Sequence, residues 1–172
     1  MLRMHALACP QYHRYVQTSP FDEIALFRAV ADSGARALLI GRRALIALGL
    51  PVMTRDYGYW IPADDAPLLN EALRPLDMFP TRSPEEARLN GRYVIEGDEH
   101  IDVLVARAVG TIDGNMVVFE DVWMRRVYLP VTEDLSIAIP SIDDLILTKR
   151  FAARPRDADD IRWLEQLRAA KP

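Results

Sequence analysis

A short apolar run between two helix-like segments places the strongest constraint on the fold. Residues 37–40 are all apolar and end at Gly41, a pattern typical of a strand that is buried on both faces. Before this run, apolar residues recur at helical spacing over residues 20–33. After it, residues 42–48 favour a short helix. The alternation of helix, strand and helix predicts a protein in which a sheet and helices pack together.

The segments that follow extend this pattern into a mixed sheet. Aromatic and apolar residues predict a strand over 54–61, and Asp64 begins a further helix. The other expected strands are 92–96 and 99–106, joined as an antiparallel hairpin through a two-residue Gly97-Asp98 turn, and 116–120, 125–129 and 134–139. Helices are expected after Ser141 and after Pro155. The sequence predicts an α/β (α+β) fold in which helices flank a mixed sheet and two helices end the chain.

Length and composition favour one domain in a reducing compartment. The chain has 172 residues, of which half are hydrophobic, enough for one well-packed core. Residues 1–19 show no sustained period and are predicted to form an N-terminal arm before a single domain at 20–172. A single cysteine, Cys9, excludes an intramolecular disulfide, and no apolar run approaches the length that spans a bilayer. We therefore expect a soluble, cytoplasmic protein that does not bind membranes.

Two features match the requirements of nucleotidyl transfer. That chemistry needs metal-binding carboxylates on a strand, and small or basic residues at a helix start that face the triphosphate. Gly41 ends the first strand and opens the next helix, and Asp56 lies fifteen residues later on the next predicted strand. Gly58 occupies the position of a second carboxylate on the same face of that strand. The acidic motif is therefore incomplete.

These residues resemble those of a known family. The pattern Leu39-Ile40-Gly41, followed by thirteen residues after Arg42 and then Asp56-Tyr57-Gly58-Tyr59, is similar to the signature of the DNA polymerase beta superfamily of nucleotidyltransferases. Within it, the chain most resembles small bacterial nucleotidyltransferases related to abortive-infection toxins. Their C-terminal segment is similar to Ser141–Ile146 followed by Lys149, Arg154, Asp157 and Asp160.

The resemblance implies a substrate, a cofactor and a set of site residues. It implies transfer of a nucleoside monophosphate from a nucleoside triphosphate, with Mg²⁺, to a hydroxyl of an RNA, a protein or a small molecule. A toxin or antitoxin partner is implied as well. The implied catalytic and metal-binding residues are Asp56 and Asp102, and the implied nucleotide-binding residues are Gly41, Arg42, Arg43, Lys149 and Arg154. Two positions depart from the family pattern, because Arg42 replaces a small residue and Gly58 replaces the second metal-binding aspartate.

Several of these residues also have a structural interpretation. Asp102 is either a third carboxylate of the site or an ordinary aspartate that faces solvent. Asp56 either binds metal or pairs with Arg55 or Arg42. Lys149 ends an inward stripe that starts at Ile142, and its ammonium faces either phosphate or an acidic site, or reaches out to solvent from the helix edge.

The last two candidate aspartates have two interpretations each, and the overall function has three. Asp157 and Asp160 either stabilise the start of the last helix or take part in catalysis, and Arg154 is expected to bridge them. Gly58 favours a second hypothesis for the whole chain, an inactive nucleotidyltransferase-fold protein that binds a nucleotide or a partner. A third hypothesis is a nucleic-acid-binding module, and the net charge of −4 argues against it. It would use local basic clusters, which are Arg42-Arg43, Arg55, and Lys149-Arg150 continuing to Arg154 and Arg156.

Overall fold

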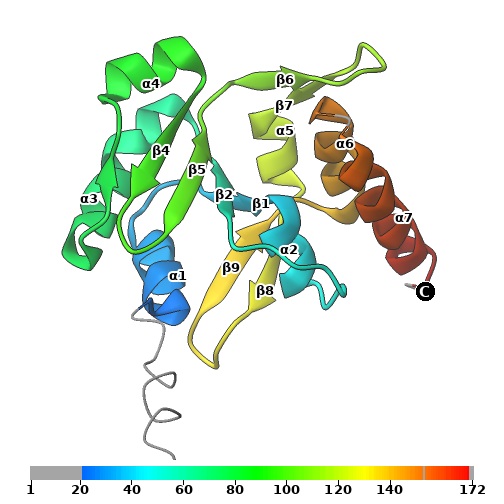
Figure 1. Cartoon of the computed structure of the whole chain (residues 1–172), viewed down its shortest axis with the longest axis horizontal. Helices are drawn as coiled ribbons and strands as arrows, with labels where there is room; N and C mark the ends of the chain where they lie inside the picture. Colours follow the sequence, from blue (N-terminus) through cyan, green and yellow to red (C-terminus); the bar gives the residue numbers. More distant parts are fainter. Residues whose placement is uncertain (1–20, 153, 171–172) are drawn as a thin grey trace, which may run out of the picture.

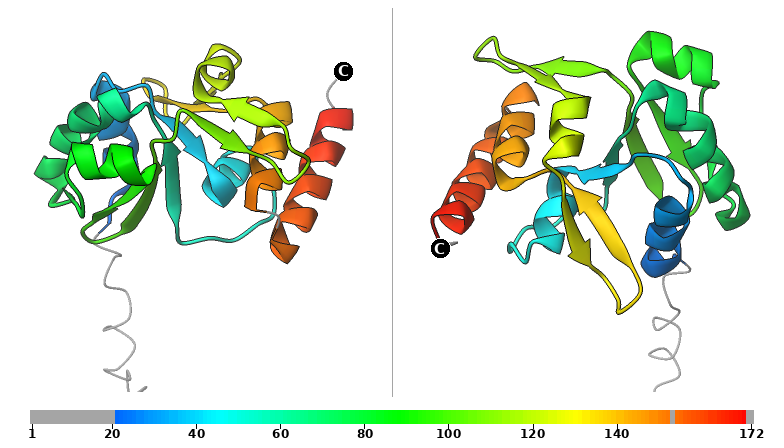
Figure 2. Two further views of the ribbon diagram at one scale, coloured as in Figure 1. Left: turned by 90° about the horizontal axis from the view of Figure 1, so that it is seen from above. Right: turned by 180° about the vertical axis from the view of Figure 1, so that it is seen from behind.

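The structure is a computed structural model that describes residues 21–152 and 154–170, so the predicted N-terminal arm lies outside the described residues. A central sheet separates two groups of helices (Figure 1). Helices α3 and α4 lie at one end, and α6 and α7 lie side by side at the other, as the two further views also show (Figure 2). Among the described helices, none is both long enough and apolar enough to cross a membrane.

The described elements alternate between helix and strand. The helices are α1 (Glu23–Asp32), α2 (Gly41–Ala47), α3 (Ala66–Leu73), α4 (Pro84–Asn90), α5 (Phe119–Met124), α6 (Ile142–Ala152) and α7 (Pro155–Ala170), with short 3₁₀ turns η2 (Ala63–Asp65) and η3 (Arg74–Leu76). The strands are β1 (Leu38–Ile40), β2 (Tyr57–Trp60), β3 (Phe79–Pro80), β4 (Arg92–Glu96), β5 (His100–Leu104), β6 (Ala108–Gly110), β7 (Met116–Val118), β8 (Val127–Pro130) and β9 (Ser136–Ile139).

The main sheet is mixed, as the sequence predicted. Its strand order is β1-β2-β5-β4-β3, and β2 and β5 run parallel while the other neighbours run antiparallel. Strands β6 and β7 form one hairpin and β8 and β9 form another, with β9 packed beside β1. The parallel pair is important for function because it brings two segments that are far apart in the sequence into register.

The two faces of the sheet are covered by different elements. Successive strand residues point to opposite faces, so Tyr59 belongs to the core packed against α1 and α3, and its neighbour Trp60 belongs to a second cluster packed against α5 and the β6–β7 hairpin. Trp60 is fully buried, and its indole Nε1 donates a hydrogen bond to the carbonyl oxygen of Ala106 at 2.7 Å. The bond satisfies the polar atom of a large buried aromatic side chain.

Several predicted boundaries needed correction, among them the starts of α1 and β2 and the turn between β4 and β5. The first described helix begins at Glu23 because Asp22 is its N-cap, accepting a hydrogen bond from the Ala25 amide at 3.1 Å. Strand β2 begins at Tyr57, so Asp56 precedes the strand on which it was predicted to lie. The hairpin between β4 and β5 has a three-residue loop, because Glu96 pairs with His100.

Helices α4 and α5 and the short strands β3 and β6 were absent from the prediction. Ser83 and Glu86 form a capping box at the start of α4, with the Glu86 amide 3.2 Å from the Ser83 hydroxyl. This signal is readable in the sequence as Ser-Pro-Glu-Glu. The six-residue α5 lies between predicted strands and has no side-chain cap, so local sequence gives little sign of it. The expected cap of α6 is confirmed, because the Asp144 amide donates to the Ser141 hydroxyl at 3.2 Å.

Candidate functional site

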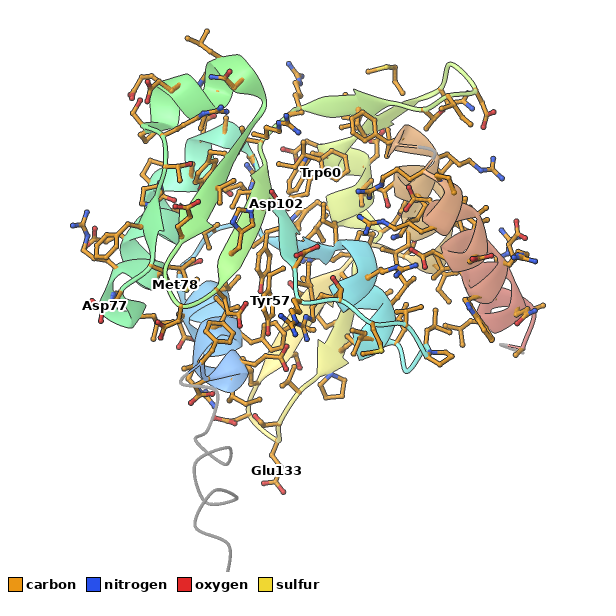
Figure 3. The ribbon with its side chains drawn as sticks, viewed as in Figure 1. Tyr57, Trp60, Asp77, Met78, Asp102 and Glu133 are labelled. Atoms are coloured by element: carbon orange, nitrogen blue, oxygen red, sulfur yellow. The ribbon has the colours of Figure 1, made fainter. Side chains whose placement is uncertain are left out.

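The floor of the candidate site is the parallel pair β2 and β5. Gly58 of β2 pairs in register with Asp102 of β5. Ile101 and Val103 are buried while Asp102 is exposed, which confirms that its carboxylate points away from the face of its two neighbours. Figure 3 shows Asp102 on β5 in the middle of the molecule, between the two groups of helices.

A cleft of about 200 Å³ opens above this floor. It is lined by Ile40, Gly41, Arg42, Thr54, Asp56, Tyr57, Gly58, Asp102, Lys149, Arg154 and Arg156. Six of the seven residues predicted for the site therefore line one cleft, although they come from four separate segments of the chain. At its edge, Gly41 takes a φ of 70°, a left-handed conformation that favours glycine.

Arg42 of α2 binds the carboxylate of Asp160, which lies on α7 and is not part of the cleft lining. Its Nε lies 3.2 Å from both Asp160 Oδ1 and Asp160 Oδ2, and its Nη2 lies 3.1 Å from Asp160 Oδ1. Asp160 is fully buried in α7. Arg42 therefore ties α2 to α7 in this structure, and it does not pair with Asp56.

Lys149 of α6 joins the same carboxylate. Its side chain is 7% exposed, and its Nζ lies 2.6 Å from Asp160 Oδ2 and 3.6 Å from Asp157 Oδ1. The inward direction that the Ile142 stripe predicted is confirmed, and the ammonium faces an acidic site within the protein. Lys149 and Arg42 thus share one buried aspartate, which makes Asp160 the centre of a network joining three helices.

The network holds Asp160 in its charged form. Burial alone would raise the pKa of this carboxyl, but hydrogen bonds from Arg42 and Lys149 outweigh it, and the pKa lies below the usual 3.8. A buried carboxylate with two cationic donors has little need of a further ligand. Asp160 is therefore a structural partner of the basic residues.

The other two predicted basic residues make different contacts. Arg43 lies over the ring of Tyr57, with its Cζ 4.1 Å from the ring centroid, and its Nη1 lies 3.1 Å from Glu23 Oε1. It binds α1 and is not part of the cleft lining. Arg154 donates from its amide and its Nε to Asp157 Oδ2 at 3.0 and 3.2 Å, and no bond to Asp160 accompanies these, so the expected bridge between the two aspartates does not form.

The carboxylates of the cleft, Asp56 and Asp102, which we call the acidic floor, have fewer charged partners than its cations. Those cations are Arg42, Lys149, Arg154 and Arg156, which we call the basic wall. Asp56 and Asp102 are both exposed, and among the residues that the structure describes neither lies within 4.0 Å of a lysine or arginine nitrogen. The nearest basic atom to Asp102 is His100 Nε2, 3.7 Å from Oδ1. Two free carboxylates beside one cleft form a region of negative potential that suits a cation.

The donor set fits Mg²⁺ that arrives with a phosphate substrate. Mg²⁺ is commonly held by one or two carboxylates together with substrate phosphates and water, and Asp56 and Asp102 supply two carboxylates. A metal cage made by protein alone needs more ligands, and within residues 21–152 and 154–170 no group of three His, Cys, Asp or Glu side chains is suitably placed.

Some residues of the cleft were not singled out as site residues from the sequence. Arg156 lines the cleft, is exposed, and has no ion pair with the part of the chain that the structure describes. The only sequence signal was its membership of the basic run after Lys149. Thr54 accepts a hydrogen bond from the Asp56 amide through its hydroxyl at 3.1 Å and so positions that residue. No sequence pattern indicated this contact.

Several solved structures of nucleotidyltransferases have a similar fold. The chain superposes on the antibiotic-resistance factor ANT(2'')-Ia with a TM-score of 0.58 at 16% identity, covering 86% of this chain and 87% of that one. It superposes on the lincosamide antibiotic adenylyltransferase LnuA, solved with lincomycin bound, with a TM-score of 0.56 at 15% identity, covering 84% and 96% of the two chains. A Thermotoga maritima protein described as a nucleotidyltransferase, TM1012, gives 0.53 at 13% identity, covering 94% and 98%.

The chain has the nucleotidyltransferase fold. Identities this low establish the fold and leave the activity open. No protein-family model matches the chain, and no curated protein matches it in sequence. Within the nucleotidyltransferase fold, this chain combines two carboxylates without a lysine or arginine partner among the described residues, Asp56 and Asp102, with cations of which Arg42 and Lys149 share the buried Asp160.

Proposed function

We propose that this protein binds a nucleoside triphosphate with Mg²⁺ in the cleft and transfers the nucleoside monophosphate to a hydroxyl of a small molecule. The observation that carries the proposal is the pairing of Gly58 with Asp102 on the floor of a cleft that also holds Asp56 and exposed cations. The free carboxylates Asp56 and Asp102 would hold Mg²⁺. When bound, the ion would supply positive charge to the phosphate oxygens.

The basic residues of the cleft would bind the phosphates. Arg156 is exposed and without an ion pair to any described residue, so it is available to a phosphate oxygen. Lys149 and Arg42 add positive charge at the back of the cleft, although Asp160 neutralises part of it. The wall would therefore orient the triphosphate mainly through Arg156 and the half-exposed Arg154.

The transfer would make one bond and break one bond at the α-phosphorus. The acceptor hydroxyl oxygen bonds to the α-phosphorus as the bond from that phosphorus to the pyrophosphate oxygen breaks, and pyrophosphate leaves. The hydroxyl proton passes to the Asp102 carboxylate, which is exposed beside the cleft. A small-molecule acceptor is proposed because ANT(2'')-Ia was solved with adenylyl-2''-tobramycin and LnuA with lincomycin.

A second candidate function follows from Gly58. With one carboxylate missing from the floor, the cleft would bind a nucleotide, and with it a regulatory partner, without transferring a phosphate group. The backbone leaves room for the missing group, because a Cβ at Gly58 would meet Ile40 Cγ1 at 3.4 Å and no other described atom more closely. Restoring an aspartate at this position therefore tests the site without disrupting the sheet.

The experiment compares the wild-type chain with Gly58→Asp and Asp102→Asn. Each protein is incubated with α-labelled nucleoside triphosphates and Mg²⁺ or Mn²⁺, with tobramycin, lincomycin, pooled RNA and pooled protein as separate acceptors. Label transfer by the wild type and by Gly58→Asp, lost in Asp102→Asn, would support the proposed enzyme. Transfer by Gly58→Asp alone would support the binding module, and transfer by neither would contradict the proposed enzyme. Transfer to RNA or protein in place of the small molecules would correct the acceptor class.

A further inference from the structure

Arg42 lies at the boundary between the cleft and the interior of the protein. It lines the cleft, and its side chain is 26% exposed. The Asp160 side chain that it binds has no exposed surface and is not part of the cleft lining. The guanidinium of Arg42 therefore contacts a buried carboxylate and is also within reach of a ligand in the cleft.

Asp160 has a second cationic partner that is more deeply buried. Lys149 Nζ lies 2.6 Å from Asp160 Oδ2, and the lysine side chain is only 7% exposed. The same Nζ lies 3.6 Å from Asp157 Oδ1, a buried atom that makes no hydrogen bond to any residue the structure describes. Lys149 is thus held between two buried carboxylates. If Arg42 moved away, Asp160 would keep Lys149, so its charge would not be left buried and unpaired.

The contacts of Arg42 are of a kind that a phosphate group can replace. Its Nε lies 3.2 Å from both carboxylate oxygens of Asp160, its Nη2 lies 3.1 Å from Oδ1, and its Nη1 donates to the Met53 carbonyl oxygen at 3.4 Å. A phosphate accepts the same paired N–H bonds from a guanidinium as a carboxylate does. A triphosphate also carries several negative charges, whereas the single charge of Asp160 is already compensated by Lys149. A triphosphate in the cleft is therefore the stronger partner for Arg42.

From these contacts we propose that Arg42 exchanges partners: it binds Asp160 in the free protein and a phosphate group when a nucleoside triphosphate enters the cleft. The exchange breaks the contact between α2 and α7, while Lys149 of α6 keeps its bond to Asp160. The contact in the free protein lowers the phosphate affinity of the cleft, because it must be broken first. This inference rests on the proposed binding of a triphosphate, and it involves no step of the transfer reaction.

Nuclear magnetic resonance of the wild-type chain tests the exchange directly. The probe is inorganic tripolyphosphate in EDTA, so that no metal ion contributes. We expect saturable shifts of the Arg42 Nε–Hε signal and of the Asp160 carboxyl carbon, since one gains a phosphate and the other loses a donor. The signal of Arg162, which pairs with Asp159 on the exposed side of α7, should stay unchanged. Absence of saturable binding, or a shift at Arg42 without one at Asp160, would overturn the proposal.

A double-mutant cycle tests the same exchange by calorimetry. Asp160→Asn keeps the shape of the side chain and weakens its bond to Arg42, so affinity for tripolyphosphate should rise about three- to tenfold. In a chain that already carries Arg42→Ala, the same substitution should give no gain, because no guanidinium is released. A gain that persists in the Arg42→Ala background would mean that only the removal of a negative charge matters, and the proposal would be wrong.

Asp159→Asn is the matched control for the cycle. It makes the same change of charge at the neighbouring, exposed position of α7, so affinity should change by less than about twofold. A rise as large as that of Asp160→Asn would also count against the exchange. The magnetic resonance test needs no variant, so it decides the question even if Asp160→Asn does not fold.

The outcome is separable from that of the proposed transferase. Label transfer to an acceptor, with no change at Arg42 and Asp160 on binding of tripolyphosphate, would support the transferase and overturn the exchange. The reverse pattern, shifts at both residues without label transfer, would support the exchange and contradict the transferase.

Discussion

The two sides of the cleft differ in how fully their charges are compensated. On the helical side, Arg42 and Lys149 converge on Asp160, which is fully buried and bonded by both. On the sheet side, Asp56 and Asp102 are exposed and lack a lysine or arginine partner among the described residues. The same charged residue types therefore act differently: the helical side joins α2, α6 and α7, whereas the sheet side is available to a ligand.

The comparison predicts that the largest effect on stability comes from Asp160. Asp160→Ala would leave Lys149 buried without its nearest carboxylate, so we expect the free energy of unfolding to fall by about 3–5 kcal/mol. Urea denaturation followed by circular dichroism would measure the change. Asp159→Ala is the matched control, because Asp159 is exposed and, among the described residues, forms an ion pair only with the exposed Arg162. Similar losses for the two variants would contradict the distinction between the sides.

The same carboxyl should make part of the stability depend on pH. Its pKa in the folded chain lies below 3.8, because hydrogen bonds from Arg42 and Lys149 outweigh the effect of burial. A depressed pKa gives stability that is present above the unfolded value and is lost as pH falls through the folded value. The difference in unfolding free energy between the wild type and Asp160→Asn should therefore be constant from pH 7 to about 5 and shrink below 3.8. A difference that stays unchanged in acid would contradict this expectation.

A substitution on the sheet side of the cleft should change ligand affinity and have little effect on the free energy of unfolding. Asp102→Asn removes a charge from an exposed carboxylate, so the fold should be unaffected, while affinity for a nucleoside triphosphate with Mg²⁺ should fall about tenfold. Calorimetric titration in Mg²⁺ and again in EDTA would measure both states. Asp98→Asn, in the loop before β5, is the control. The proposed metal assignment is wrong if Asp102→Asn weakens binding equally in EDTA.

The smallest expected effect concerns the exposed end of the basic wall. Arg156→Ala removes a cation that has no carboxylate partner among the described residues, so nucleotide affinity should fall about two- to fivefold at low salt. The loss should shrink as ionic strength rises, because salt screens exposed charges. Arg168→Ala is the control, because it removes a cation from another part of α7 that is paired with Asp143 of α6. Equal losses for the two would mean that the effect is only one of net charge.

Much of the candidate site was accessible from local sequence. The glycine at 41, the alternation around Asp102 and the inward stripe ending at Lys149 each follow from the spacing of neighbouring residues, and the structure confirms the direction of the Asp102 and Lys149 side chains. The hidden capping box of α4 was also readable. Local patterns gave the wrong start for β2, because the predicted strand included Asp56. The end of a strand depends on its pairing, and the pairing of β2 with β5 begins at Tyr57.

The sequence by itself determined the class of fold and most of the order of helices and strands, because these depend on spacing between neighbours in the chain, although α4, α5, β3 and β6 were not predicted. The gap in the acidic motif at Gly58 is a prediction from the family resemblance. Only the tertiary structure decided which charges meet. Arg42 and Asp160 are separated by 118 positions. No local pattern indicates that the guanidinium of Arg42, which follows Gly41, pairs with a buried carboxylate on the last helix. Charge partners are chosen by which elements pack together, and burial then determines whether a charged residue must be paired within the protein or stays free to bind a ligand.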